Sequence, residues 1–166
     1  TWYRPDIPET GDYILKSLDF YVGDIPVTVA AFGKEIGDYE IYGIKELDVY
    51  INDSLSQTLI MQEAIEKDGI PMVEEGYTRC PESIAEEHLI KTVDINFDGY
   101  LDLQVYAWDT KDDDLYYYYC WNPEENEFEY AFRLNTPEID TENQLLITYN
   151  IVSRYEMYHY KYYKVN

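Results

Sequence analysis

Cysteine and positive charge are scarce in this chain of 166 residues. Its two cysteines are enough for one disulfide but too few for a structural zinc site. Only 12 basic residues stand against 34 acidic ones, which gives a formal net charge of −22. Such a field repels nucleic acid and anionic membrane surfaces and attracts cations and basic proteins. We therefore set nucleic-acid binding aside, and acidity for solubility alone remains the other explanation of the charge.

The sequence also lacks long apolar runs. No stretch is long enough to span a bilayer, so we expect no transmembrane segment. The first residues show no basic segment followed by an apolar one, as a secretion signal would. Because Thr1 is not a natural initiator, we expect a trimmed N-terminus, and a secretion signal or a lipid-anchor cysteine upstream stays open.

Aromatic residues are abundant instead. They make up 17% of the chain, led by 20 tyrosines, and hydrophobic residues together reach 46%. This composition is typical of a globular protein and favours strands over helices. We expect an N-terminal arm or linker over residues 1–12, which hold two prolines, and one all-β domain over residues 13–166.

Short runs of alternating apolar and polar residues, separated by turn residues, predict about ten antiparallel strands. They indicate a single compact sandwich, barrel or propeller-like arrangement. Pro81 can begin one short helix that continues to Glu87, with acidic residues in its first turn. Residues 57–67 fit both periods, and we interpret them as a strand followed by a turn. The predicted strands cover residues 18–22, 25–32, 47–51, 57–62, 89–95, 101–107, 115–121, 127–133, 145–152 and 155–165.

The most informative stretch is residues 94–102, which contain oxygen-bearing side chains at alternate positions followed by Gly99. A hard cation such as Ca²⁺ takes six to eight oxygen ligands, and this spacing brings alternate side chains to one centre. Gly99 allows the sharp turn that wrapping an ion requires. The expected calcium ligands are the side chains of Asp94, Asn96, Asp98 and Asp102 and the backbone carbonyl of Tyr100.

This loop is not an EF-hand, because Val105 stands where a bidentate Glu would be and strand-like residues flank the loop on both sides. The alternative is a plain hairpin turn, since Asp-Gly between apolar runs is a turn signal by itself. A plain turn does not need three neighbouring carboxylates, which would repel one another without a cation. We therefore favour the metal site.

Other candidate residues are the cysteines and a group of aromatic side chains. Cys80 and Cys120 are either one disulfide or two buried thiols. A row of exposed aromatic rings would suit a protein partner or a sugar, and we expect alternate rings of the 116–119 tyrosine run to fill the core. The candidate partner-binding residues are Trp108, Tyr116, Tyr118 and Trp121.

Signals for catalysis are few, and we expect a protein that is not an enzyme. Adjacent acids such as Glu124 and Glu125 could serve a glycosidase, but 34 acidic residues produce such pairs by composition alone. His88 and His159 lie far apart in the sequence, with no nucleophile motif beside either. Two lone histidines are more often structural.

Several motifs together resemble a family of bacterial envelope proteins. They are the string from Gly76 to Pro81, the acidic loop, the strand that ends at Trp121-Asn122-Pro123-Glu124, Phe128 and the tyrosine-rich last strand. The family includes an immunity protein of an antibacterial secretion system and is related to periplasmic inhibitors of invertebrate-type lysozyme. The loop alone is also similar to calcium loops of integrin-type β-propellers. The resemblance covers roughly residues 76–165.

The resemblance implies a calcium-stabilised binding protein located outside the cytoplasm, whether secreted, periplasmic or lipid-anchored. Its partner would be a cationic protein such as a cell-wall hydrolase, which it would inhibit. An envelope location also favours the disulfide between Cys80 and Cys120. The alternative function is a carbohydrate-binding module that uses tyrosine and tryptophan faces.

Overall fold

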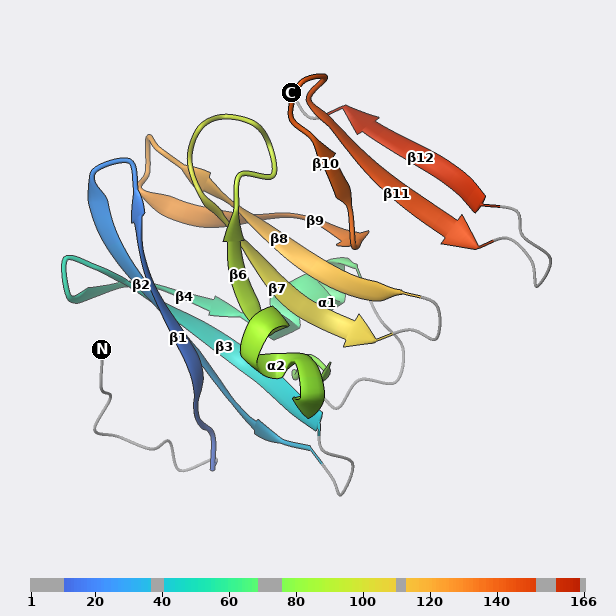
Figure 1. Cartoon of the computed structure of the whole chain (residues 1–166). Helices are drawn as coiled ribbons and strands as arrows, with labels where there is room; N and C mark the ends of the chain where they lie inside the picture. Colours follow the sequence, from blue (N-terminus) through green and yellow to red (C-terminus); the bar gives the residue numbers. More distant parts are fainter. Residues whose placement is uncertain (1–10, 37–40, 69–75, 110–112, 152–157, 165–166) are drawn as a thin grey trace.

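The described residues fold into three antiparallel sheets with two short helices (Figure 1). A computed structural model describes residues 11–36, 41–68, 76–109, 113–151 and 158–164. None of the three sheets of the described residues closes on itself. The predicted all-β class is confirmed, and of the three expected arrangements the sandwich is the one observed.

The first sheet is a meander of four strands: β1 (Tyr13–Val22), β2 (Ile25–Glu35), β3 (Ile41–Ile51) and β4 (Ser54–Ile60). A fifth, two-residue strand, β5 (Cys80–Pro81), pairs with the start of β3. The turn between β3 and β4 is tight because Asn52 and Asp53 adopt φ angles of 50° and 66°, the conformation that a two-residue hairpin loop requires. Asn and Asp tolerate that region better than other non-glycine residues.

The second sheet contains β6 (Ile90–Val93), β7 (Asp102–Asp109), β8 (Asp114–Asn122) and β9 (Glu127–Asn135), paired in that order. The predicted alternation in β7 and β9 is therefore real strand structure. The turn between β8 and β9 is fixed by Asn122, whose side-chain oxygen accepts hydrogen bonds from the backbone N–H groups of Glu124 and Glu125 at 2.9 and 3.3 Å. The third sheet contains β10 (Glu138–Asp140), β11 (Leu145–Ile151) and β12 (Tyr158–Lys164) and lies beyond β9 in Figure 1.

Within the described ranges there are two helices where the sequence predicted one. The expected helix is confirmed as α2 (Glu82–His88), directly after Pro81. The second, α1 (Met61–Lys67), overturns the strand-then-turn interpretation of residues 57–67, because β4 ends at Ile60 and the helix begins at once. The sequence of this segment fits the periodicity of a strand and that of a helix, and burial in the folded protein favours the helix. Met61 and Ala64 are buried, and the Met61 sulfur accepts a hydrogen bond from the Tyr119 hydroxyl at 4.0 Å.

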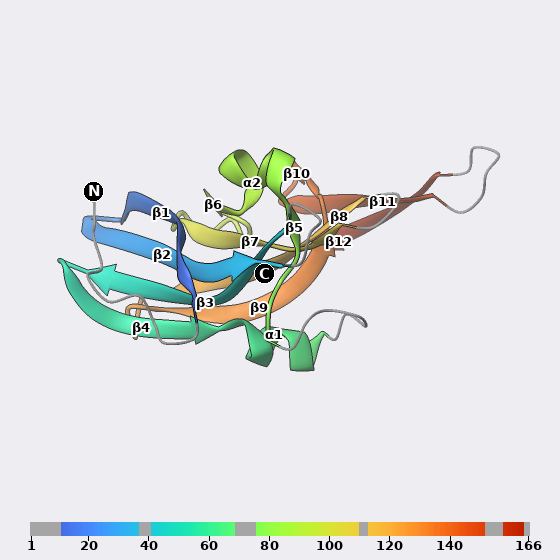
Figure 2. The ribbon, with the colours of Figure 1, turned by 90° about the horizontal axis from the view of Figure 1, so that it is seen from below.

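The core lies between the first and second sheets, which stack as two layers (Figure 2). Aromatic rings from both layers meet at one end of it. The ring centroids of Phe20 on β1 and Phe128 on β9 are 6.4 Å apart, and Trp121 packs edge-on against Phe128 at 4.9 Å. Aromatic contacts therefore join the two layers at this end of the core.

Gln57 joins the two layers by a different kind of contact. Its side-chain nitrogen donates to the carbonyl of Phe128 at 2.6 Å, and its side-chain oxygen accepts from the N–H of Phe128 at 2.9 Å. One amide side chain on β4 thus satisfies both backbone groups of a residue on β9. The Gln57 side chain thus supplies the two hydrogen bonds that a neighbouring strand would otherwise make with Phe128.

The predicted N-terminal arm over residues 1–12 lies outside the described residues except for Gly11 and Asp12. Asp12 is buried, and its carboxylate accepts a hydrogen bond from the Tyr77 hydroxyl at 2.9 Å. Much of the predicted last strand is observed as β12, while residues 155–157 and 165 lie outside the description. Within the described part of the chain, neither helix has the length and apolar character needed to cross a bilayer.

Candidate metal centre

The 94–102 loop joins β6 to β7 at the end of the sandwich that also carries the β1–β2 turn (Figure 1). A β-carbon placed on Gly23 in that turn would lie 3.8 Å from the ring of Tyr100, so the two loops are neighbours. The backbone curls tightly because Phe97 and Gly99 both adopt positive φ angles, of 60° and 88°. For Gly99 this conformation carries no penalty, as the sequence indicated.

Asp94 is the residue around which the loop wraps. One carboxylate oxygen accepts a hydrogen bond from the N–H of Asp98 at 3.2 Å, and the other accepts from the N–H of Gly99 at 2.9 Å. Asp98 in turn accepts from the N–H of Tyr100 at 3.0 Å. Backbone N–H donors therefore orient the carboxylates of Asp94 and Asp98.

Asp102 connects the loop to the rest of the second sheet. Its side chain is fully buried, and its two oxygens accept hydrogen bonds from the N–H of Ile95 at 3.0 Å and the N–H of Trp121 at 2.8 Å. The pKa of Asp102 is raised to about 7, mainly by burial and to a lesser extent by the carboxylates of Asp98 and Asp94, although the two backbone donors act to lower it. In this environment a carboxylate that binds a proton or a cation is more stable than an ionised carboxylate without either.

The three carboxylates converge on one point. Asp94, Asp98 and Asp102 can each place an oxygen within 4.8 Å of the others, a grouping that could hold a metal ion. The side-chain oxygen of Asn96 is buried and has no hydrogen-bond partner among the described residues, which is unusual for a buried acceptor. Tyr100 lies half-buried in the same loop. The structure thus brings three of the five predicted ligands together. A fourth, Asn96, has a side-chain oxygen that accepts no hydrogen bond from the described residues.

The predicted partner-binding residues are placed differently from expectation. Tyr116, Tyr118 and Trp121 are 2%, 0% and 3% exposed, so they belong to the core and the prediction of an exposed aromatic face is wrong. The run at 116–119 is buried throughout because β8 is an inner strand whose two faces are both covered. Trp108 is half-buried, with the Arg79 guanidinium stacked 4.7 Å from its ring centroid.

The predicted disulfide is also absent. Cys80 and Cys120 are both free thiols, the first buried and the second half-buried. The N–H of Arg79 bonds to the carbonyl of Ala107, which places Cys80 at the far end of β7, whereas Cys120 on β8 lies near the 94–102 loop. Burial raises the pKa of each thiol to about 12. Location alone suggested the bridge, and the strand register keeps the two side chains apart.

Sequence reasoning missed the link between Asp102 and the N–H of Trp121. The spacing of the loop identified Asp102 as a ligand, but the donor comes from a strand 19 positions further on. No sequence pattern near Asp102 predicts that the Trp121 N–H is its hydrogen-bond donor. Only the pairing of β7 with β8 brings it within reach.

Comparison of the chain with protein-family models, with curated proteins and with solved structures finds no match. Because one fold serves many activities, the chemistry of the 94–102 loop is more informative about function than the sandwich is.

Proposed function

We propose that the 94–102 loop is a divalent-cation site and that its ion is Ca²⁺. The observation that carries this proposal is the buried Asp102 carboxylate facing Asp94 and Asp98. The buried side-chain oxygen of Asn96, in the same loop, has no hydrogen-bond partner among the described residues. Three carboxylates in one loop repel one another, and a divalent cation offsets that repulsion. All expected donors are oxygen atoms, which suits a hard cation and not zinc or copper.

Calcium fits these donors better than magnesium does. Ca²⁺ accepts six to eight oxygens in irregular geometry, whereas Mg²⁺ requires a compact octahedron and releases its waters reluctantly. A loop that supplies five oxygens and lacks a bidentate Glu suits the larger ion, with water completing the shell. The affinity expected for such a site is modest, on the order of 10⁻⁴ to 10⁻³ M.

Calorimetric titration of chelator-stripped protein tests the choice of ion. We expect Ca²⁺ to bind with a single-site isotherm and Mg²⁺ to bind at least about tenfold more weakly. Equal binding of the two ions would indicate a nonspecific acidic surface, and absence of a calcium isotherm at millimolar concentrations would show that the loop is only a turn.

The role proposed for the ion is structural. Asp102 bonds to the backbone of both the loop and β8, so an ion held by Asp102 fixes the 94–102 loop to the end of the second sheet.

The remaining proposal is that the chain is a binding protein without catalytic activity that acts outside the cytoplasm. Its net charge of −22 supports a cationic partner, for which an inhibited cell-wall hydrolase is the candidate that the family resemblance supplies. The carbohydrate-binding alternative loses its support, because the tyrosines on which it depended are buried.

Inhibition of a cationic muramidase tests the partner proposal. We expect inhibition that weakens as salt rises, because charge mainly accelerates encounter and is screened within a shorter Debye length. An unrelated protein of matched size and negative charge is the control for nonspecific attraction. Equal inhibition by that control, or no inhibition of any muramidase class at low salt, would contradict the proposal.

A further inference from the structure

A second polar site lies at the opposite end of the first sheet, where the strand register gathers aromatic and acidic side chains on one face. Glu35 on β2 is paired with Tyr42 on β3, and Tyr13 on β1 is paired with Gly33, two positions before Glu35. Because alternate residues of paired strands point to the same side, these three side chains share a face. Lys16, paired with Ala31, lies on that face as well.

Helix α2 covers this face and closes a pocket of about 280 Å³. Leu15, Ala85 and Leu89 provide its apolar part. Tyr13 and Tyr42 line it with aromatic rings, and Tyr13 is 39% exposed at its mouth. The acidic residues of the lining are Glu82 and Glu86, both from α2.

One hydrogen bond within the pocket orients Glu82. The Tyr42 hydroxyl donates to a carboxylate oxygen of Glu82 at 3.3 Å. Glu35 and Glu82 raise the pKa of both Tyr13 and Tyr42, after the effect of burial, so negative potential is concentrated between the two rings. This combination of carboxylates, tyrosine rings and an apolar wall is complementary to a cation carried on an apolar stem.

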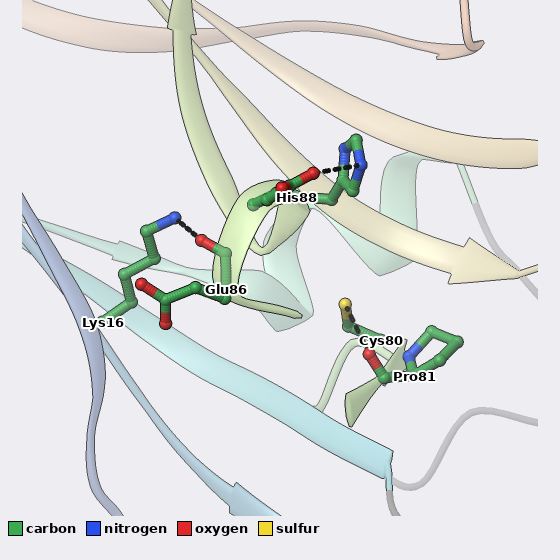
Figure 3. A network of polar contacts seen from close by, with 6 residues as sticks. Lys16, Cys80, Pro81, Glu86 and His88 are labelled. Atoms are coloured by element: carbon green, nitrogen blue, oxygen red, sulfur yellow. Dashed lines mark hydrogen bonds and ion pairs between the residues drawn. The ribbon is translucent and has the colours of Figure 1, made fainter. Parts of the chain in front are cut away.

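Among the described residues that line the pocket, Lys16 is the one cation, and its position leaves the acidic groups available. Its ammonium donates to the backbone carbonyl of Glu86 and not to a carboxylate (Figure 3). Two lining carboxylates, those of Glu82 and Glu86, therefore stand against a single ammonium group among the described residues, and Glu35 adds negative potential from the same face of the sheet. Within that part of the chain, the net charge around the pocket is negative.

We propose that this pocket binds the side chain of a lysine or arginine residue of a partner protein, with the cation between the tyrosine rings and Glu82 and the stem against Leu15 and Leu89. The inference deepens the proposed function, because it supplies the contact through which a cationic partner is held, and it rests on that function for the identity of the partner. The ligand chemistry can be tested without the partner. The two proposals therefore fail separately.

The test is an NMR titration of the methyl groups of Leu15, Ala85 and Leu89 with N-acetyl-lysine methylamide. The uncharged probe N-acetyl-norleucine methylamide has a stem of the same length and serves as the reference ligand. We expect saturable methyl shifts with the lysine probe, with a dissociation constant in the millimolar range for a ligand of that size, and at least about fivefold weaker binding of the norleucine probe.

Two variants decide whether the pocket, and not the overall charge, binds the probe. Glu82→Gln should weaken binding about three- to fivefold, as expected for a partly exposed ion pair, whereas Glu124→Gln in the distant β8–β9 turn removes the same charge and should change nothing. Lys16→Met should strengthen binding, because it removes the competing ammonium group. A purely structural role of Lys16 would not produce that gain.

Three results would overturn the proposal. They are equal shifts with both probes, equal effects of Glu82→Gln and Glu124→Gln, or no saturable methyl shift with the lysine probe. Muramidase inhibition without probe binding would leave the proposed function intact and remove only this pocket from it.

Discussion

Asp102 is the residue whose environment departs furthest from that of an ordinary carboxylate. Its pKa is about 7 in the folded protein, raised by burial from a usual value of 3.8, so the folded state binds the proton more tightly than the unfolded state does. The stability that this proton supplies is complete below pH 3.8 and is lost as the pH rises through about 7. In the proposed function, a cation bound by the loop would take over the role of the proton at higher pH.

Metal-free protein should therefore lose stability as the pH rises from about 5 to about 8, by on the order of 2 kcal/mol from Asp102 alone. Urea denaturation at several pH values measures it. Asp102→Asn should flatten this part of the profile, since the amide does not titrate. An unchanged slope in Asp102→Asn would show that other carboxylates cause the loss.

Asp98 provides the corresponding test of ligation. Its carboxylate is exposed and makes one hydrogen bond, to the N–H of Tyr100, so replacing it disturbs the fold little. We expect Asp98→Ala to weaken calcium binding by about tenfold or more, because it removes one of three charges from the site. Asp24→Ala, in the neighbouring β1–β2 turn, is the control for general loss of negative charge. A comparable loss of affinity in both variants would argue against direct ligation.

The two cysteines should behave as buried thiols. Because the pKa of each is raised to about 12, almost no thiolate forms near neutral pH. Titration with a thiol reagent should find two free thiols in denatured, unreduced protein and slow reaction in the native state. A finding of no free thiols after denaturation would mean that the strand register described for β5 and β8 is wrong.

Among the elements, β4 and β9 are joined by the two hydrogen bonds of the Gln57 side chain. Gln57→Ala leaves the N–H and the carbonyl of Phe128 without their partners, which should cost about 2 kcal/mol or more of the free energy of unfolding. Ser56→Ala, at the exposed neighbouring position, is the matched control and should change little. Equal stability of the two variants in urea denaturation would show that the amide bridge contributes nothing.

Strands and turns could largely be predicted from the sequence because they depend on neighbouring residues. The hairpin of β1 and β2 around Gly23 and the alternation in β9 are local patterns, and the acidic loop carries its own spacing. Helix α1 could not be separated from a strand, because its register was decided by the burial of Met61 and Ala64 under distant residues. The aromatic run of β8 was misread for a similar reason: sequence alone does not show that both faces of a strand are covered.

The same distinction applies to the two sites: the 94–102 loop could be predicted from the sequence, and the pocket under α2 could not. The loop residues Asp94, Asp98 and Asp102 are close in sequence, so their convergence could be predicted. The Tyr13, Tyr42 and Glu82 side chains come from three elements separated by dozens of residues, and only the sheet register and the position of α2 bring them to one pocket. No spacing rule connects residues of that kind.

At the scale of the whole molecule, the dominant property is the net charge of −22. Self-repulsion of this size destabilises the compact state, and any salt relieves part of it by screening. Specific calcium binding differs from screening because it acts at one site and at low concentration. The two effects are separated by comparing calcium with sodium at the same ionic strength.

The most direct test of a calcium-stabilised fold is thermal denaturation of chelator-stripped protein with and without Ca²⁺ at constant ionic strength. A ligand that binds only the folded state stabilises it by mass action, by about 1.4 kcal/mol at tenfold excess over its dissociation constant, which corresponds to roughly 3–6 °C for a chain of this size. We predict that rise with Ca²⁺, its reversal by EDTA and its loss in Asp98→Ala. Identical melting temperatures in calcium and in matched sodium chloride would contradict the account and leave the 94–102 loop a turn.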